Sequence, residues 1–195
     1  QPMFETAEVG NKVDKKTFAR EVPKLREALL EVQRELAESP LSVVILISGV
    51  EGAGKTETAN LLFEWMDARG IETHAMWDPS DEERERPPMW RFWRVLPPTG
   101  RIAVLFGSWY TAPIIGRVFG EHDQAHLDQA LDRIVELERM LTAENTVVIK
   151  FWMHIAKSVQ KRRFKELESD PKTSWRVTKL DWKFFKRYEA RMQDE

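Results

Sequence analysis

Apolar and polar residues along this chain follow two patterns, one typical of buried strands and one typical of helices. Residues Leu41–Ser48 are almost all apolar and rich in β-branched side chains, which predicts a strand buried on both faces of a parallel sheet. The segment Phe18–Leu36 instead repeats apolar residues at intervals of three and four, which predicts one face of an amphipathic helix.

The same two patterns alternate to the end of the chain. Further strands are predicted at Ile71–Trp77, Arg101–Phe106 and Thr146–Trp152. Further helices are predicted at Lys55–Arg69, Trp90–Leu96, Ala112–Phe119, Asp123–Leu141, Ala156–Glu168 and Thr178–Met192. Strands that alternate with helices form βαβ units, so we expect one α/β domain with a parallel sheet over residues 1–195.

The composition is typical of an ordered globular domain and excludes several classes of protein. Of the 195 residues, 42% are hydrophobic and 32% are charged, which argues against disorder. The chain has no cysteine, which excludes a thiolate zinc site and a cysteine nucleophile. No apolar run approaches the roughly 20 residues of a membrane-spanning helix, so we expect no membrane partner. The absence of cysteine favours a reducing compartment, and we expect a cytoplasmic protein.

The net charge of −2 is a cancellation between two regions. From Lys157 to Arg191 there are twelve Lys or Arg and five Asp or Glu residues, a net +7, whereas the rest of the chain carries −9. Basic residues clustered on an acidic body indicate a focused anion site, although most charge runs are solvated helix faces. The acidic body gives no reason to expect a nucleic-acid partner.

The segment Gly49–Thr56, Gly-Val-Glu-Gly-Ala-Gly-Lys-Thr, matches the phosphate-loop pattern G-x-x-x-x-G-K-[ST] between a predicted strand and a predicted helix. Glycines let the backbone turn its N–H groups toward a phosphate, and the following helix adds its positive N-terminal end. Lys55 is expected to reach the outer phosphates and Thr56 to bind Mg²⁺. The loop residues predicted to bind phosphate are Gly49, Gly52, Ala53, Gly54, Lys55 and Thr56.

Phosphate-loop enzymes usually hold Mg²⁺ with a second carboxylate at the end of a neighbouring strand. Here the strand Arg101–Phe106 ends without a carboxylate. Glu51, within the loop, is the better candidate to face the metal, with a solvent-exposed side chain as its alternative. Asp78 is a weaker candidate because it precedes Pro79 and is typical of a turn.

Four stretches together resemble the polyphosphate kinase 2 family. They are Gly49–Lys55, similar to the family's G-x-D-A-A-G-K; Arg86–Pro97, similar to its W-R-F-W-R-x-L-P; Ser108–Tyr110, similar to F-D-R-S-W-Y-N-R; and Lys150–Ile155 with Arg163–Lys165, Asp170-Pro171 and Trp175, similar to K-F-W-L-H-I…K-R-F…D-P…W-K. Four matches in the same order, spread from Leu25 to Tyr188, make the resemblance specific.

The resemblance implies a P-loop kinase-like three-layer αβα fold with a helical lid at residues 156–192. It also implies a Mg²⁺-dependent phosphotransferase that moves phosphoryl groups between inorganic polyphosphate and a nucleoside mono- or diphosphate. In the parent protein the implied reaction converts AMP to ADP with polyphosphate as the phosphoryl donor. Lys55 and Glu51 would be its catalytic residues, and Thr56 and Glu51 its metal ligands. Lid and helix residues expected to bind phosphate or nucleotide are Arg91, Arg94, Arg162, Arg163, Lys165 and Arg176.

The chain also departs from the family pattern at the site. Phe106 stands at the family's metal-binding Asp and Gly107 at its Arg, while Thr111 and Ala112 replace an Asn-Arg pair. These changes favour an alternative hypothesis, in which this is a catalytically degenerate domain with a structural or regulatory role beside an active homologous copy. We expect the chain to be part of a longer two-domain protein that forms homo-oligomers.

Several interpretations stay open on sequence grounds. An ATP-dependent nucleoside monophosphate kinase is a lesser alternative, which the aromatic runs near Trp90 and Trp152 argue against. Arg91 and Arg94 share a helix face and would either contact phosphate or be exposed beside packed aromatic rings. Trp109 is expected in the core rather than stacked on a base, and His154 is expected to be hydrogen-bonded rather than catalytic.

Overall fold

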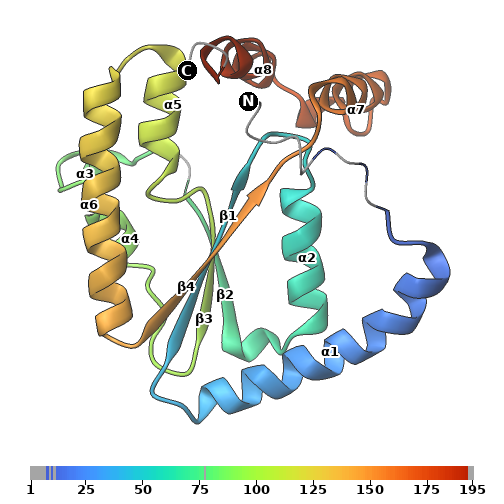
Figure 1. Cartoon of the computed structure of the whole chain (residues 1–195), viewed down its shortest axis with the longest axis vertical. Coiled ribbons are helices and arrows are strands. Elements are labelled where there is room, and N and C mark those ends of the chain that lie inside the picture. The colour runs from blue at the N-terminus through green and yellow to red at the C-terminus, as the bar shows by residue number, and fades with distance from the viewer. Residues whose placement is uncertain (1–7, 9, 11, 77, 193–195) are drawn as a thin grey trace.

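The computed structural model describes residues 8, 10, 12–76 and 78–192 (Figure 1). Its centre is a parallel four-stranded sheet in the order β2-β3-β1-β4. The strands are β1 (Ser42–Gly49), β2 (Ile71–Ala75), β3 (Ile102–Phe106) and β4 (Thr146–Met153). Each predicted strand is therefore present, with its ends within two residues of the prediction; Trp77 lies outside the described residues.

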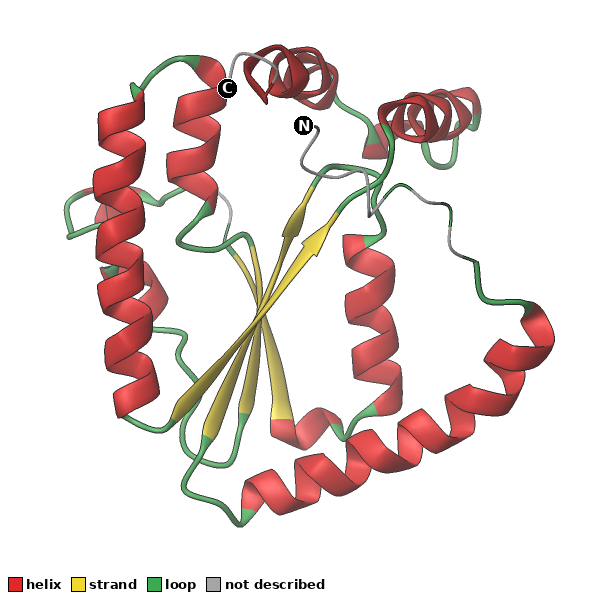
Figure 2. Ribbon diagram, in the orientation of Figure 1, coloured by secondary structure: helices red, strands yellow, loops and turns green. Residues whose placement is uncertain are grey.

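Helices cover both faces of the sheet, as Figure 2 shows. They are α1 (Lys15–Ala37), α2 (Lys55–Trp65), the 3₁₀ helix η2 (Ala68–Gly70), α3 (Asp81–Arg84), α4 (Trp90–Trp93), α5 (Thr111–Phe119), α6 (Gln124–Ala143), α7 (Lys157–Ser169), the 3₁₀ helix η3 (Ser174–Arg176) and α8 (Lys179–Met192). In Figure 1, α1 and α2 lie on one side, α5 and α6 lie on the other, and α7 and α8 lie beyond the carboxyl ends of β1 and β4. The predicted three-layer α/β architecture is confirmed.

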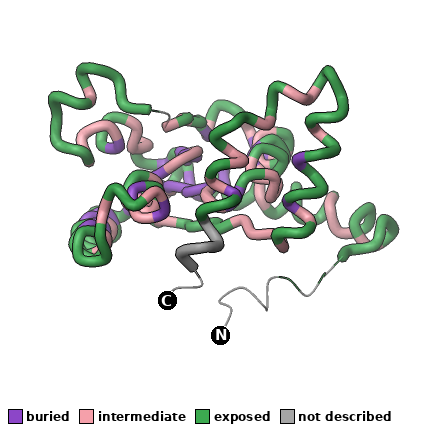
Figure 3. The backbone as a smooth tube through the Cα atoms, turned by 90° about the horizontal axis from the view of Figure 1, so that it is seen from above, coloured by how far each residue is buried: buried purple, intermediate pink, exposed green. Residues whose placement is uncertain are grey.

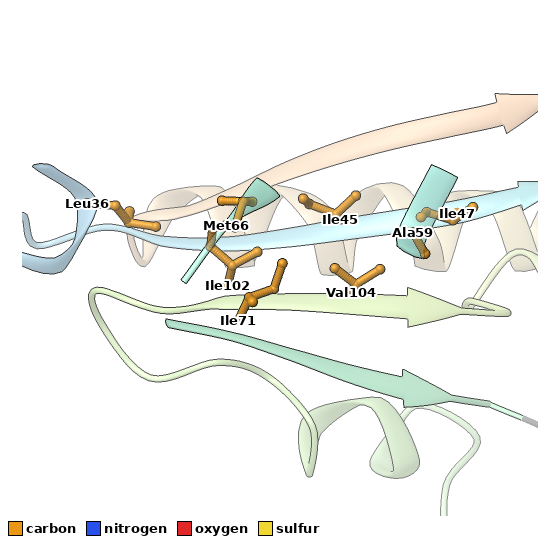
Figure 4. Packing of buried hydrophobic residues seen from close by; sticks show 8 residues of the cluster. All are labelled: Leu36, Ile45, Ile47, Ala59, Met66, Ile71, Ile102 and Val104. Carbon is orange, nitrogen blue, oxygen red and sulfur yellow. The ribbon is translucent and has the colours of Figure 1, made fainter. Parts of the chain in front are cut away.

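Two apolar clusters hold the layers together. On the α1 and α2 side, Ile45, Ile47 and Val104 from the sheet pack with Leu36 and Ala59 from the helices (Figure 4). On the other side, β1 and β3 pack against α4 and α6, with Val44, Leu46, Leu105, Phe92, Ile134, Leu137 and Leu141 in the cluster. Alternate residues of β1 thus serve opposite faces, as expected for a central strand. Buried residues accordingly concentrate on the central strands in Figure 3.

The helix predicted at Lys55–Arg69 ends earlier, at Trp65. Met66 is already extended, at φ −116° and ψ 163°. The buried side chain of Gln33 accepts a hydrogen bond from the Asp67 N–H and donates one to the Asp67 carbonyl, both at 2.7 Å. Because these bonds satisfy the backbone groups that a longer helix would have used, the chain turns into η2 instead.

The helix predicted at Trp90–Leu96 also ends early, at Trp93. Val95 and Leu96 donate to carbonyls three residues back, which tightens the last turn. Proline at positions 97 and 98 has no N–H and disfavours a helical residue before it, so the helix cannot continue.

The apolar stripe predicted on Phe18–Leu36 is only partly buried. Leu36 is 8% exposed, and Leu29 packs beside it on the first cluster. Phe18, Leu25 and Val32 are at least half exposed. The amphipathic pattern thus predicts the helix correctly. It does not predict that the first half of the helix lies away from the sheet, as Figure 1 shows. Within the described residues, no helix is long and apolar enough to cross a membrane.

Candidate active site

The segment Gly49–Thr56 connects the carboxyl end of β1 to the first turn of α2. Gly49, Gly52 and Gly54 have φ values of 124°, 78° and 96°, in the region that favours glycine. At Gly49 there is also no space, because a Cβ would lie 2.0 Å from the backbone oxygen of Met153. Glycine is therefore required where the loop leaves the sheet, and the predicted strand–loop–helix context is confirmed.

Lys55 folds back over this loop. Its ammonium group donates to the carbonyl oxygens of Gly49 and Val50 at 3.1 and 3.2 Å, and it lies 2.7 Å from the carboxylate of Glu51. The Lys55 side chain is 19% exposed and that of Glu51 is 49% exposed. The positive charge is thus concentrated inside the loop, where an anion can exchange for the Glu51 carboxylate.

Helix α7 packs against the outside of the loop. Gln160 donates to the carbonyl of Glu51 at 2.8 Å, and Arg163 donates to the carbonyl of Gly52 at 2.6 Å. The ring of Phe164, fully buried, lies 3.4 Å from the place a Cβ on Gly52 would occupy. Arg163 is among the residues predicted from the sequence, whereas Gln160 is not, because its loop partner Glu51 lies 109 residues away in the sequence.

Phe106 ends β3 beside β1, in register with Ile47. Its half-buried side chain packs on the first cluster, and its carbonyl accepts a hydrogen bond from the Met76 N–H at 2.7 Å. Gly107 follows at φ 72°, and a Cβ there would lie 2.9 Å from the Met76 carbonyl oxygen. The backbone at this strand end therefore has little room for a side chain at position 107.

Glu138 on α6 organises the residues that follow β3. Its carboxylate accepts hydrogen bonds from Trp109 Nε1 at 3.1 Å, the Tyr110 hydroxyl at 2.8 Å and the Lys150 ammonium group at 2.7 Å. Trp109 is 2% exposed and lies edge-on to Phe92, as expected for a core residue. The predicted core position of Trp109 is confirmed.

The charges in this cluster are fixed by their surroundings. Burial opposes ionisation of Glu138, but the hydrogen bonds from Lys150, Tyr110 and Trp109 outweigh it and hold the pKa of Glu138 below its usual value. The hydrogen bond from Lys150 to Glu138 raises the pKa of Lys150, whereas burial, together with the separate hydrogen bond from the Tyr110 hydroxyl to Glu138, raises the pKa of Tyr110. At neutral pH this cluster is therefore an anion, a cation and a neutral phenol.

The basic residues predicted on α7 divide between its two faces. Arg163 lies on the loop side, whereas Arg162 and Lys165 are exposed and line an open hollow with Lys161. Arg162 pairs with Glu166 at 3.6 Å. Arg176, on η3, reaches the other end of the loop, since its guanidinium lies 3.3 Å from Glu57 in the first turn of α2.

Arg91 lies on α4 and Arg94 directly follows it as the C-cap residue, on the opposite side of the sheet from α2 (Figure 1). Arg91 is 14% exposed and lies 3.4 Å from the carboxylate of Glu83. Arg94 is exposed and lies over the ring of Trp90, 4.8 Å from its centroid. Neither residue joins the loop in this structure, so their predicted contact with phosphate stays a prediction.

Oxygen ligands suitable for Mg²⁺ are few near the loop. The Thr56 hydroxyl and the Glu51 carboxylate are both exposed there. Across the part of the chain that the structure describes, no group of three or more His, Cys, Asp or Glu residues could hold a metal ion. Mg²⁺ commonly binds through one or two protein groups and substrate phosphates, and Thr56 with Glu51 fits that arrangement.

The histidines add no catalytic group to the loop. His154 Nε2 lies 2.7 Å from the carboxylate of Glu8, which agrees with the predicted hydrogen-bonded role. His122 and His126 stack with ring centroids 3.9 Å apart, at the start of α6. Stacked parallel rings do not aim their nitrogens at a common point, so this pair does not form a metal site.

A phosphate loop between the central strand and the first crossover helix, with basic helices over the strand ends, defines a P-loop kinase-type domain. The sequence profile described as polyphosphate kinase 2 matches residues 12–194. The chain therefore belongs to the polyphosphate kinase 2 family.

Individual relatives agree with this assignment. Over 182 residues, 93% of this chain, it is 53% identical to a polyphosphate:AMP phosphotransferase of Pseudomonas aeruginosa, and it covers 37% of that protein. It is 47% identical to the polyphosphate:AMP phosphotransferase of Pseudomonas syringae, covering 96% of this chain and 38% of the relative. The crystal structure of polyphosphate kinase 2 from Arthrobacter aurescens matches with a TM-score of 0.86 at 26% identity, over 95% of this chain and 67% of the other.

Proposed function

We propose that this chain binds inorganic polyphosphate at the loop Gly49–Thr56 and contributes to phosphoryl transfer between polyphosphate and a nucleotide. In the whole protein this reaction would convert AMP to ADP. The observation that carries the proposal is the Lys55 ammonium group, held over the loop by the carbonyls of Gly49 and Val50 and within 2.7 Å of Glu51. Family membership supplies the reaction class, and the relatives named above carry that activity in their names.

In this proposal Lys55 neutralises the charge that develops on the transferred phosphoryl group. The loop N–H groups of Gly52 and Gly54 would orient it, together with that of Ala53 once this group leaves the Val50 carbonyl to which it donates at 3.3 Å. Phosphoryl transfer depends mainly on such positioning and on electrostatics. Thr56 and Glu51 would hold Mg²⁺, which supplies charge neutralisation between phosphate oxygens when bound. Lys55 is then free to leave Glu51 for the phosphate.

We further propose that residues 156–192 form the lid over the phosphates. Arg163 and Arg176 support this role, because Arg163 donates to the carbonyl of Gly52 within the loop and Arg176 donates to Glu57 in the first turn of α2. Arg162 and Lys165 would meet phosphates only from the outer face of α7. We propose as well that Arg91 and Arg94 contact the nucleotide. The same proposal includes a homo-oligomeric state and a cytoplasmic location for the protein.

A second candidate is a degenerate domain that assists an active copy. It is favoured by the end of β3, where the half-buried Phe106 packs on the first apolar cluster and little room remains for a side chain at position 107. The chain spans 37% of the length of its Pseudomonas aeruginosa relative, which leaves space for a second homologous domain in a protein of that size.

Phosphotransferase assays with a single variant separate the two candidates. Polyphosphate, Mg²⁺ and AMP or ADP are supplied to the chain and to its Lys55→Ala variant, and the product nucleotide is measured. Turnover that disappears in Lys55→Ala supports catalysis at this loop. Activity found only in a longer parent protein, and unchanged there by Lys55→Ala, would support the degenerate domain.

A further inference from the structure

Four consecutive carbonyl groups of the phosphate loop are held in two pairs from opposite sides. Lys55 holds the first two, those of Gly49 and Val50. Helix α7 holds the next two, through Gln160 on the carbonyl of Glu51 and Arg163 on that of Gly52. When a phosphate draws the Lys55 ammonium group toward itself, these carbonyl groups keep the side-chain contacts from α7, while the Val50 N–H still donates to the carbonyl of Met153.

The contacts from α7 fix the direction of the loop N–H groups. Every peptide bond described is trans, so the N–H of each peptide unit points away from its C=O. Gln160, by holding the carbonyl of Glu51, directs the Gly52 N–H away from α7. Arg163 does the same for the Ala53 N–H, which indeed faces the carbonyl of Val50 within the loop at 3.3 Å.

Glycine at position 52 makes this restraint necessary. Gly52 has φ 78° and no side chain, so the flanking peptide units can rotate at little cost unless something holds them. A loop that binds anions through N–H groups loses affinity when one of these peptide units turns its carbonyl inward. Gln160 is 7% exposed and well placed to prevent that rotation.

We infer that Gln160 is a positioning residue for phosphate binding, which keeps the Glu51–Gly52 peptide unit in its anion-binding orientation. Gln160 carries no charge, so its effect cannot be a Coulombic attraction for phosphate. The inference rests on the proposed function, because it requires that the loop bind a phosphate chain.

Gln160→Met tests the inference, since methionine keeps the length of the side chain and removes the donor. Tripolyphosphate is titrated calorimetrically into the purified chain, and the melting temperature is measured in parallel. We expect Gln160→Met to raise the dissociation constant about three- to tenfold, the range for one lost hydrogen bond. Gln160→Glu should raise it further, because a carboxylate faces both the carbonyl and the bound anion.

Gln33→Met is the matched control. Gln33 is also buried and also donates its side-chain amide to a loop carbonyl, that of Asp67. It lies at the other end of the helix that follows the loop, so its variant should lower the melting temperature and leave the dissociation constant unchanged. A purely structural role for Gln160 would give the same result as this control.

The outcomes separate the inference from the proposed function. Wild-type binding with an unchanged dissociation constant in both Gln160→Met and Gln160→Glu overturns the inference alone. If the wild-type chain does not bind tripolyphosphate, phosphate binding at the loop fails, and the inference fails with it.

Discussion

The carboxylate of Glu138 lies 2.7 Å from the ammonium group of Lys150. This ion pair joins α6 to β4, and the bonds from Trp109 and Tyr110 extend it to the segment that follows β3. The Glu138 side chain is 16% exposed and that of Lys150 is 49% exposed, so the carboxylate is shielded from water more than in an ordinary surface pair, whereas the ammonium group is not. Its position makes it a restraint on the strand end beside the phosphate loop.

Glu138→Gln should therefore destabilise the fold by about 1–3 kcal/mol, the usual cost of losing a hydrogen bond to a charged partner. Lys150 would remain beside an uncharged amide. Urea unfolding followed by tryptophan fluorescence measures the change. Glu136→Gln, an exposed position half a turn away on α6, is the control and should stay within about 0.5 kcal/mol of wild type.

The same carboxylate should make stability depend on pH. Because folding lowers the pKa of Glu138 below 4.5, its contribution is present above the unfolded value and is lost as the pH falls through the lower folded value. Unfolding curves at several pH values below neutrality should show the wild type losing its advantage over Glu138→Gln as the pH falls below 4.5. A difference that stays constant over that range contradicts this assignment.

The features that sequence analysis predicted are those set by neighbouring residues. The apolar run Leu41–Ser48 and the glycine spacing of Gly49–Thr56 are local, and both appear in the structure as expected. Gln160 could not be selected in this way, because its partner Glu51 is 109 residues away. The partners of Glu138 likewise lie 12 to 29 residues away, on other elements.

The same limit explains the predictions that failed. The helical pattern of Lys55–Arg69 continues past Trp65, but a side chain from α1 ends the helix there. The apolar stripe on α1 predicts a buried face, but burial depends on which other elements reach it. Local sequence predicts that a helix forms, whereas its last residue and its depth of burial depend on tertiary contacts.

Gly49→Ala should be far more destabilising than Gly54→Ala. Both positions have positive φ, which costs about 1–2 kcal/mol for alanine. At Gly54 a Cβ meets nothing within 4 Å, whereas at Gly49 it would lie 2.0 Å from the carbonyl oxygen of Met153. We expect a loss of about 1–2 kcal/mol for Gly54→Ala and a greater one for Gly49→Ala, measured by thermal unfolding; equal losses would contradict the close approach of β4.

Glu51→Gln should have opposite effects with and without Mg²⁺. Without the metal, the carboxylate competes with phosphate for Lys55, so its removal should tighten tripolyphosphate binding by about two- to fivefold, a modest gain because Glu51 is half exposed. With Mg²⁺ present, the variant should lose the further gain that the metal gives the wild type. Calorimetry under both conditions tests this, with Glu64→Gln at the far end of α2 as the control.

Phe106→Asp tests whether the end of β3 can serve as a metal position. The substitution removes a half-buried ring from the first apolar cluster, so we expect a loss of about 3–5 kcal/mol in stability. It also places a carboxylate beside Ile47, two residues before Gly49, where it could join Thr56 in binding Mg²⁺. Phe106→Asn is the control, because asparagine has nearly the same shape as aspartate but no charge. This variant should lose the same amount of stability as Phe106→Asp. If Mg²⁺ strengthens tripolyphosphate binding more in Phe106→Asp than in Phe106→Asn, a carboxylate at this strand end can serve as a metal ligand. Equal behaviour of the two variants would contradict a metal position at the end of β3.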